Sequence, residues 1–317
     1  MFTLDSNREM GKELRVAVVD ALTKEMEKND KLIALDADLA SASKWSDLQK
    51  KFGKRFINVG IAEANMMGVA AGLSLTGYVP FLHTFGPFAT RRAFDQLFIS
   101  GAYSKNTLNI YGSDPGFAVG HNGGTHTTFE DIALLRAIPD IVICDAADAV
   151  QMEWIITEFA KMTGVHYVRG NRKAVRNIYL PGSTFELGKG NLLREGEEYL
   201  LISSGQLVTE TLEVAEELEK KGITSDVVDM FTIKPLDKEL ILERVIGKKR
   251  VITIENHSVI NGLGSAVAEV LADNGLGIQL TRIGIDNRFG QVGTPAFLQE
   301  EYGLTTEQIL KQIDPIV

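Results

Sequence analysis

The sequence contains one cysteine in 317 residues, so an internal disulfide framework is excluded. Cys144 lies in the apolar run Ile141-Val142-Ile143-Cys144, and we expect it to be a packed thiol without a catalytic role. No apolar run approaches the roughly 20 residues that a membrane helix needs, and the N-terminus lacks the basic and apolar regions of a signal peptide. These absences predict a cytoplasmic protein with no membrane partner.

Positive charge is also scarce. Lysine and arginine together number 33 against 42 acidic residues, which gives a net charge of −9, and no dense basic block occurs. A nucleic-acid partner is therefore not expected. The chain also lacks zinc-ligand spacing, a Walker loop and a Gly-x-Ser-x-Gly motif. The glycines at residues 262 and 264 resemble part of a dinucleotide fingerprint, but the third glycine is missing, so we interpret them as a tight turn.

The sequence does contain a regular alternation of short apolar runs and segments with helical periodicity, which predicts an α/β fold. The first series has strands at residues 31–35, 56–59, 79–84, 108–111, 141–144 and 165–169. After an irregular stretch rich in glycine, a shorter series follows. We therefore predict two three-layer α/β/α domains. The first, residues 1–175, has a mainly parallel sheet; a linker at 176–191 leads to a smaller domain at 192–317.

Local signals predict where some elements begin and end. Ser6 and Glu9 form a capping-box pattern, which predicts a helix within residues 5–28. Thr127 and Glu130 repeat this pattern, which would place His126 just before a helix N-terminus. The apolar run at residues 225–231 predicts one strand of the second domain.

Residues 55–72 place one carboxylate in an apolar neighbourhood. A short strand and the turn at Gly60 lead into a helix on which Glu63 shares its side with Met67 and Ala70. Desolvation raises the pKa of a buried carboxylic acid, and Glu63 could then donate a proton to a ligand nitrogen. The alternative is that Glu63 only complements the positive end of the helix dipole.

Other candidate residues follow strand ends, where open parallel sheets bind ligands. Phe85 and Phe88 come after one strand, and a long glycine-rich stretch ending at His126 comes after the next. Arg169 and Arg8 are candidate anion ligands. Taken singly, the two phenylalanines could equally be core residues, and each arginine could be a solvated surface residue.

Four stretches in collinear order closely resemble transketolases and their thiamine diphosphate-dependent relatives. They are residues 59–66, residues 84–96, the Gly-Gly-Thr-His sequence at 123–126, and residues 254–258 together with 262–266. The resemblance covers the pyrimidine-binding and C-terminal domains. The family's diphosphate-binding domain, with its Gly-Asp-Gly metal motif, has no counterpart here, so the chain resembles the C-terminal subunit of a split transketolase.

The resemblance implies roles for individual residues. Glu63 would hydrogen-bond a ring nitrogen of the cofactor's aminopyrimidine and promote proton removal from the thiazolium. Phe85 and Phe88 would line the pyrimidine pocket, and His126 would contact the hydroxyls and carbonyl oxygen of the substrate. Substrate ligands implied by position are Arg8, Arg169, and Ser41 or Ser43.

Several positions depart from the family pattern while staying in the implied site. Asn122, preceded by His121, replaces the usual aspartate of the Asp-Gly-Pro-Thr-His sequence, and Arg91 replaces an aromatic residue at the cofactor. Asp114 stands where transketolases commonly have a phosphate-binding histidine. A carboxylate there would repel a dianion, so the resemblance implies a different distal group or a different way of binding it.

The implied activity is transfer of a two-carbon ketol unit from a ketose to an aldose. It would require an N-terminal partner subunit that holds the diphosphate of thiamine diphosphate and Mg²⁺ or Ca²⁺, in an α2β2 assembly. Alternatives are a subunit like deoxyxylulose-phosphate synthase or like the β chain of 2-oxo acid dehydrogenases, or a non-catalytic interaction subunit. The Thr-His sequence leading into residues 129–133 favours transketolase over the dehydrogenases.

Overall fold

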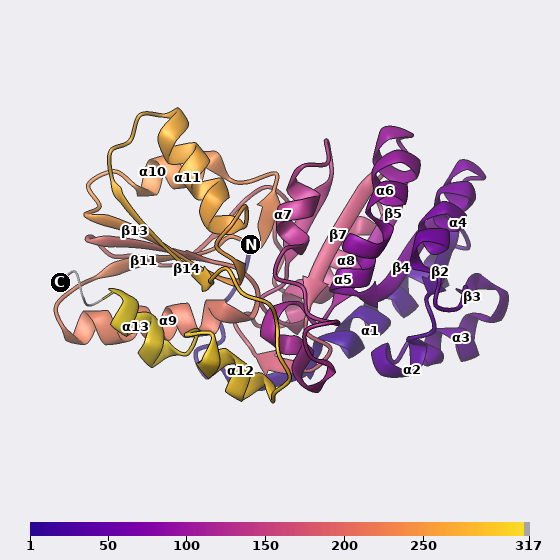
Figure 1. Cartoon of the computed structure of the whole chain (residues 1–317), viewed down its shortest axis with the longest axis horizontal. Coiled ribbons are helices and arrows are strands. Elements are labelled where there is room, and N and C mark those ends of the chain that lie inside the picture. The colour runs from indigo at the N-terminus through magenta and orange to yellow at the C-terminus, as the bar shows by residue number, and fades with distance from the viewer. Residues whose placement is uncertain (314–317) are drawn as a thin grey trace.

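The computed structural model describes residues 1–313 as two α/β units that lie side by side (Figure 1). Each unit is built on its own sheet, with helices on both faces. The predicted fold class is therefore confirmed. The boundary at residues 176–191 stays a prediction, and residues 314–317 of the predicted second domain lie outside the described part. No helix within residues 1–313 combines the length and apolar character needed to cross a membrane.

The larger sheet has seven strands in the order β12-β6-β7-β5-β4-β2-β3. They are β2 (Leu32–Asp36), β3 (Phe56–Asn58), β4 (Val79–Phe85), β5 (Leu108–Ser113), β6 (Val142–Asp145), β7 (Val165–Gly170) and β12 (Thr232–Lys234). The strands from β2 to β7 pair in parallel, and only β12 is antiparallel to its neighbour. All five residues of β2 are buried, as expected for a strand covered on both faces.

Helices cover the two faces of this sheet in separate apolar clusters. One cluster contains Leu22 and Met152 and joins the sheet to α1 (Leu14–Lys28), α3 (Ser46–Phe52) and α8 (Ala149–Phe159). The other contains Met66 and Leu97 and joins it to α4 (Glu63–Leu75), the π-helix η3 (Leu97–Tyr103) and α7 (Asp131–Arg136). The remaining short helices of this unit are α2 (Ala40–Ser43), η1 (Gly53–Arg55), α5 (Gly86–Ala89), η2 (Arg91–Ala93), α6 (Phe94–Gln96) and η4 (Gly116–Asn122).

The smaller sheet has five strands in the order β14-β13-β10-β11-β9. They are β9 (Asn191–Arg194), β10 (Tyr199–Ser203), β11 (Ser225–Asp229), β13 (Arg250–Ser258) and β14 (Gln279–Ile285). Its helices are η5 (Gly205–Leu207), α9 (Val208–Lys220), α10 (Lys238–Arg244), α11 (Leu263–Asp273), α12 (Pro295–Glu301) and α13 (Thr306–Ile313). On α9, Thr211, Val214 and Leu218 are buried at spacings of three and four, which is the amphipathic pattern of a helix on a sheet.

The two units share a core. The predicted strand at 225–231 ends at Asp229, and the chain then crosses to the larger sheet, where β12 pairs with β6 through Thr232 and Cys144. A single apolar cluster runs from Ile143 in the larger sheet to Ile202 in the smaller one. Part of the larger sheet therefore comes from outside residues 1–175, which apolar periodicity alone did not indicate.

The N-terminal helix begins later than predicted. Residues 10–13 form strand β1 (Met10–Glu13), which pairs with β8 (Ala174–Arg176), and α1 starts at Leu14 without a side-chain cap. The capping-box interpretation of Ser6 and Glu9 is therefore wrong. The backbone of residues 10–13 instead finds its hydrogen-bond partners in a strand about 160 residues away in the sequence.

Candidate functional site

Several of the predicted residues gather at one edge of the larger sheet because they follow the ends of parallel strands. Glu63 comes after β3, Phe85 ends β4 and Asp114 follows β5. Beneath them, the fully buried His83 lies 2.9 Å from Asp36 and 3.1 Å from Ser113. This contact ties β2, β4 and β5 together at the edge where open parallel sheets bind ligands.

Glu63 is the first residue of α4 and is only 2% exposed. Nη1 of Arg92 donates to both carboxylate oxygens at 2.9 Å, and Thr84 Oγ1 donates to one of them at 3.4 Å. Burial was predicted from the apolar helix. Arg92 was missed, because nothing in its local sequence separates it from an ordinary surface arginine except its place after two phenylalanines.

Three aromatic rings pack against one another beside the Arg92 guanidinium that holds this carboxylate, and the centroids of the Phe85 and Phe88 rings are 6.0 Å apart. The ring of His126 is 5.1 Å from that of Phe88 and 5.6 Å from that of Phe85, measured between centroids. The Arg92 guanidinium lies 3.7 Å from the centre of the Phe88 ring. We call Phe88, His126 and Phe85 the aromatic row. The fold therefore brings together four of the predicted residues, Glu63 and the aromatic row. They follow the ends of β3, β4 and β5, with His126 on the loop after β5.

The loop that carries His126 is not held by the predicted capping box of Thr127 and Glu130. Helix α7 begins only at Asp131, and the Glu130 carboxylate accepts from the neighbouring N–H of Phe129, so the expected capping box is not formed. The loop instead packs on residues 286–294 of the smaller unit. A Cβ added to Gly124 would lie 2.3 Å from the carbonyl oxygen of Gly290. This close approach requires glycine and positions the segment leading to His126 from outside its own unit.

Arg172 packs on the Phe85 ring of the aromatic row. Its guanidinium lies 4.7 Å from the Phe85 ring centre, its backbone N–H donates to Asp114 at 2.8 Å, and its Nε donates to the same carboxylate. Asp114 is 2% exposed. Burial raises the pKa of Asp114, and the Arg172 charge opposes that shift. Arg172 was not identified from the sequence, although Asp114 was.

A third arginine that was not identified from the sequence, Arg15, lies beside the polar segment after β2. Nη1 of Arg15 donates to the carbonyl of Ala42 at 2.7 Å, and its other nitrogens donate to Glu13. This pairing holds the pKa of Glu13 at about 2. Of the two predicted serines in this segment, Ser43 is buried against carbonyl groups of its own helix, whereas Ser41 is exposed. Only Ser41 is accessible to a ligand.

The prediction that Arg169 binds an anionic ligand needs correction. Its side chain is fully buried, with Nε 2.8 Å from Asp131, Nη1 3.3 Å from Asp145 and Nη2 3.1 Å from the carbonyl of Asn256. The two carboxylates and the carbonyl, which come from both units, use the donors that a substrate would need. Arg169 is thus a structural cation of the junction between the units.

Arg8 is also placed away from the aromatic row. It pairs with Glu216 on α9 of the smaller unit. The other predicted residues lie on the exposed rim of the site: His121 and Asn122 are exposed on η4, and Arg91 pairs with Glu130 at 3.0 Å. Between Phe88 and this rim lies an open cavity of about 330 Å³ lined by Pro87, Phe88, Arg91, Arg92 and Thr125.

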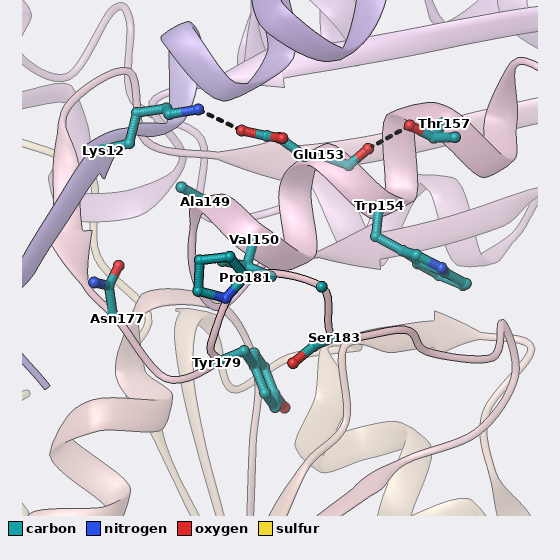
Figure 2. Close-up of a pocket in the computed structure, with 11 residues that line it drawn as sticks. Lys12, Ala149, Val150, Glu153, Trp154, Thr157, Asn177, Tyr179, Pro181 and Ser183 are labelled. Atoms are coloured by element: carbon teal, nitrogen blue, oxygen red, sulfur yellow. Dashed lines mark hydrogen bonds and ion pairs between the residues drawn. The ribbon is translucent and has the colours of Figure 1, made fainter. Parts of the chain in front are cut away.

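Another cavity, of about 500 Å³, lies away from these residues. Figure 2 shows it between α8 and the segment leading to Ser183, with Trp154 and Tyr179 on its walls and the Lys12–Glu153 ion pair at one side. None of the predicted site residues lines this cavity. The residues predicted to carry the chemistry therefore lie at the sheet edge with Glu63 and the aromatic row, and not at this cavity.

Comparison with known proteins bears on what this site is. The family model described as transketolase, pyrimidine binding domain matches residues 11–177, which include Glu63, the aromatic row and Asp114. The model described as transketolase, C-terminal domain matches residues 188–309. The chain belongs to the transketolase family. Membership of this family implies use of thiamine diphosphate.

Individual relatives of this transketolase-family chain are similar along almost their whole length. It is 41% identical over 298 residues to the 6-deoxy-6-sulfo-D-fructose transketolase subunit SqwH of Clostridium sp. (strain MSTE9), covering 94% of this chain and 92% of the relative. It is 42% identical over 288 residues to a putative transketolase C-terminal section from Methanocaldococcus jannaschii, covering 90% of each. A solved structure named split gene transketolase, inactive beta4 tetramer, matches with a TM-score of 0.88 and 40% identity, covering 96% of this chain and 98% of that one.

Proposed function

We propose that this chain is the pyrimidine-binding subunit of a split, thiamine diphosphate-dependent transketolase. It transfers a two-carbon ketol unit from an anionic ketose to an aldose. The observation that carries this proposal is the juxtaposition of the buried Glu63 carboxylate with Phe88 and His126. Such a site offers a flat apolar wall, a carboxyl group for a ring nitrogen, and an imidazole for a substrate oxygen.

Each residue of the candidate site has a distinct task in this reaction. Glu63 would hydrogen-bond a ring nitrogen of the aminopyrimidine, and Phe88 would offer an aromatic face to that ring. When bound, thiamine diphosphate supplies the electron sink that allows a carbon–carbon bond of the ketose to break. His126 binds the substrate's hydroxyls and carbonyl oxygen and stabilises the charge that develops there. Phe85 keeps the imidazole in place through its edge-to-face contact.

The proposal assigns the diphosphate and its metal ion to an N-terminal partner subunit. Within residues 1–313, no group of three or more His, Cys, Asp or Glu side chains is arranged to hold a metal. The names of two relatives also point to division of the enzyme between chains, since one is called a subunit and the other a split gene transketolase with an inactive beta4 tetramer. We propose an α2β2 assembly that holds Mg²⁺ or Ca²⁺ through the partner.

The distal end of the substrate lies at Arg172 in this proposal. Arg172 lies over the ring of Phe85, which contacts His126, and the buried Asp114 neutralises its charge. A neutralised arginine suits a singly charged group better than a phosphate dianion. One relative is named for a sulfo-sugar. We therefore propose a sulfonate or another monoanion at this end, with Ser41 on the rim.

The test is reconstitution with the natural partner. The chain and its partner, purified together with thiamine diphosphate and Mg²⁺, are supplied with sulfonated and phosphorylated ketoses and a set of aldoses. We expect ketol transfer by the complex, with the sulfonated ketose preferred, and no transfer by either chain alone. Robust turnover by this chain alone would refute the division between subunits.

The decisive variant is Glu63→Gln, which keeps the shape of the side chain but removes the acid. We expect the variant to assemble normally, while turnover falls by at least about a hundredfold, because general acid–base catalysis contributes about 10² to 10⁴ in rate. Full turnover in the assembled variant would leave only a non-catalytic, partner-stabilising role for the chain.

A further inference from the structure

Arg92 makes two contacts at the candidate site. Its Nη1 lies 2.9 Å from both oxygens of Glu63, and its guanidinium lies 3.7 Å from the centre of the Phe88 ring. These are the two surfaces that the proposed function gives to the aminopyrimidine: an acid for its ring nitrogen and an aromatic face for its plane. A guanidinium is itself planar, bears N–H donors and stacks on aromatic rings. It therefore satisfies both surfaces at once.

Resting on the proposed function, we infer that Arg92 occupies the aminopyrimidine position in the cofactor-free subunit and must leave it when the cofactor binds. Two planar groups cannot lie on the same face of Phe88 and bind the same carboxylate. Cofactor binding is then an exchange, in which the ring displaces the guanidinium from Glu63. Arg92 is a placeholder for the cofactor, and no covalent step is involved.

The placeholder has a physical purpose in an empty site. Glu63 is 2% exposed, and its only other hydrogen-bond donor within residues 1–313 is Thr84, at 3.4 Å. A buried carboxylate without a cation or a full set of donors is costly. Arg92 removes that cost and keeps Phe88 covered until the cofactor arrives.

The surroundings of Arg92 permit the exchange. Its side chain is 45% exposed and faces the open cavity of about 330 Å³, so the guanidinium can move into water without disturbing the core. Arg169 makes the contrast clear: it is fully buried between two carboxylates and a carbonyl of the other unit. Of these two arginines, only Arg92 is placed to leave its carboxylate.

The exchange reduces the apparent affinity for the cofactor. When the binding-competent state is a minor one, the apparent Kd is the intrinsic Kd divided by the population of that state. Removing Arg92 makes every molecule competent. The complex should then bind thiamine diphosphate more tightly, even if Arg92 also assists a later step of turnover.

The experiment is a calorimetric titration of thiamine diphosphate, with Mg²⁺ present, into the assembled two-subunit complex. We expect Arg92→Ala to lower the apparent Kd by about tenfold, which corresponds to a competent population of about one tenth in the wild type. Arg92→Lys should lower it less, because lysine keeps the charge but cannot stack as a plane. If Arg92→Ala does not assemble, Arg92→Lys decides the question alone.

A matched control is available at Arg55. Its guanidinium also lies over an aromatic ring, 4.9 Å from the centre of Phe52, and it pairs with Asp30 at 3.7 Å. Arg55 comes just before β3, at the opposite end of that strand from Glu63. Arg55→Gln should leave the Kd unchanged. Equal or weaker cofactor binding by both Arg92 variants would overturn the inference. Absence of saturable binding by the wild-type complex would instead overturn the proposed function.

Discussion

At the scale of single residues, burial and partners decide what a side chain does, and identical residue types take opposite roles. Arg92 is half-exposed on a carboxylate beside an open cavity, whereas Arg169 is fully enclosed by Asp131 and Asp145. In the sequence, nothing distinguishes their different environments. The same holds for the histidines: His126 stands at the site, while His166 is packed against Phe159 inside the core.

His166 provides a prediction about pH. Desolvation lowers its pKa to about 4, from an ordinary value of 6.5, and its Nδ1 lies 2.6 Å from Asn109. Between pH 6.5 and pH 4 the unfolded chain therefore binds a proton that the folded chain excludes, and acidification favours unfolding. The loss approaches about 1.4 kcal/mol per pH unit in this window.

We expect the thermal unfolding midpoint of the wild type to fall more steeply from pH 6.5 to pH 4 than that of His166→Gln. Other buried titrating groups, such as His257 and Glu255, are present in both proteins and cancel in the comparison. If the unfolding midpoints of the two proteins fell in parallel with pH, His166 would not have a lowered pKa in the folded protein, and the prediction would be wrong.

At the scale of elements, helix ends and loops depend on groups far away in the chain. Helix α11 begins at the glycine pair that was weighed as a dinucleotide motif, and the buried Glu255 accepts from the N–H groups of Leu263 and Gly264 at 2.7 and 2.9 Å. Burial raises the pKa of Glu255 to about 7. An internal carboxyl group thus fills the place that a phosphate would need, which agrees with the interpretation of these glycines as a turn.

The loop before His126 shows the same dependence and yields a prediction. In Gly124→Ala the new methyl group would meet the backbone carbonyl of Gly290, which cannot move aside as a side chain would. His126 would shift with its loop, and small misplacements of catalytic groups can cost about a hundredfold in rate. We expect turnover of the assembled complex to fall by at least about tenfold, with assembly retained.

Gly277→Ala is the matched control for that variant. Nothing lies within 4 Å of a Cβ added at Gly277, so turnover should match the wild type. Wild-type turnover by Gly124→Ala as well would mean that the smaller unit does not position His126.

At the scale of the whole molecule, the two units form one structure through a buried polar junction. Arg169 on β7 joins Asp131, the first residue of α7, to the backbone of Asn256 on β13. Burial raises the pKa of the neighbouring Asp145, although the Arg169 charge opposes that shift. The crossing strand β12 adds backbone pairing between the units. The smaller unit is thus part of the framework that supports the edge of the larger sheet where Glu63 and the aromatic row lie.

Arg169→Met tests this junction, because methionine fills much of the volume but leaves two buried carboxylates without a cation. Breaking a buried ion pair in this way costs about 3–5 kcal/mol, so we expect a large fall in the denaturant midpoint of unfolding. Arg194→Met, which removes a partly exposed pair with Glu219 at 2.6 Å, should cost less than about 1 kcal/mol. Equal, small effects of both changes would argue against a structural role for Arg169.

The sequence by itself determined the features that depend on local pattern. Alternating periodicities identified two α/β units, and a carboxylate among small apolar residues identified Glu63 as buried, since both signals lie within one element. The order of strand ends also brought Phe85, Phe88 and His126 to one edge of the sheet.

Only the tertiary structure decided which partners these residues have. It placed Arg92 on Glu63, Arg172 on Asp114, Arg169 in the junction, β12 in the other sheet and Gly124 against Gly290. The physical reason is that each of these contacts joins residues separated by many positions along the chain. Periodicity reports which face of an element is apolar, but it carries no information about which distant group that face will meet.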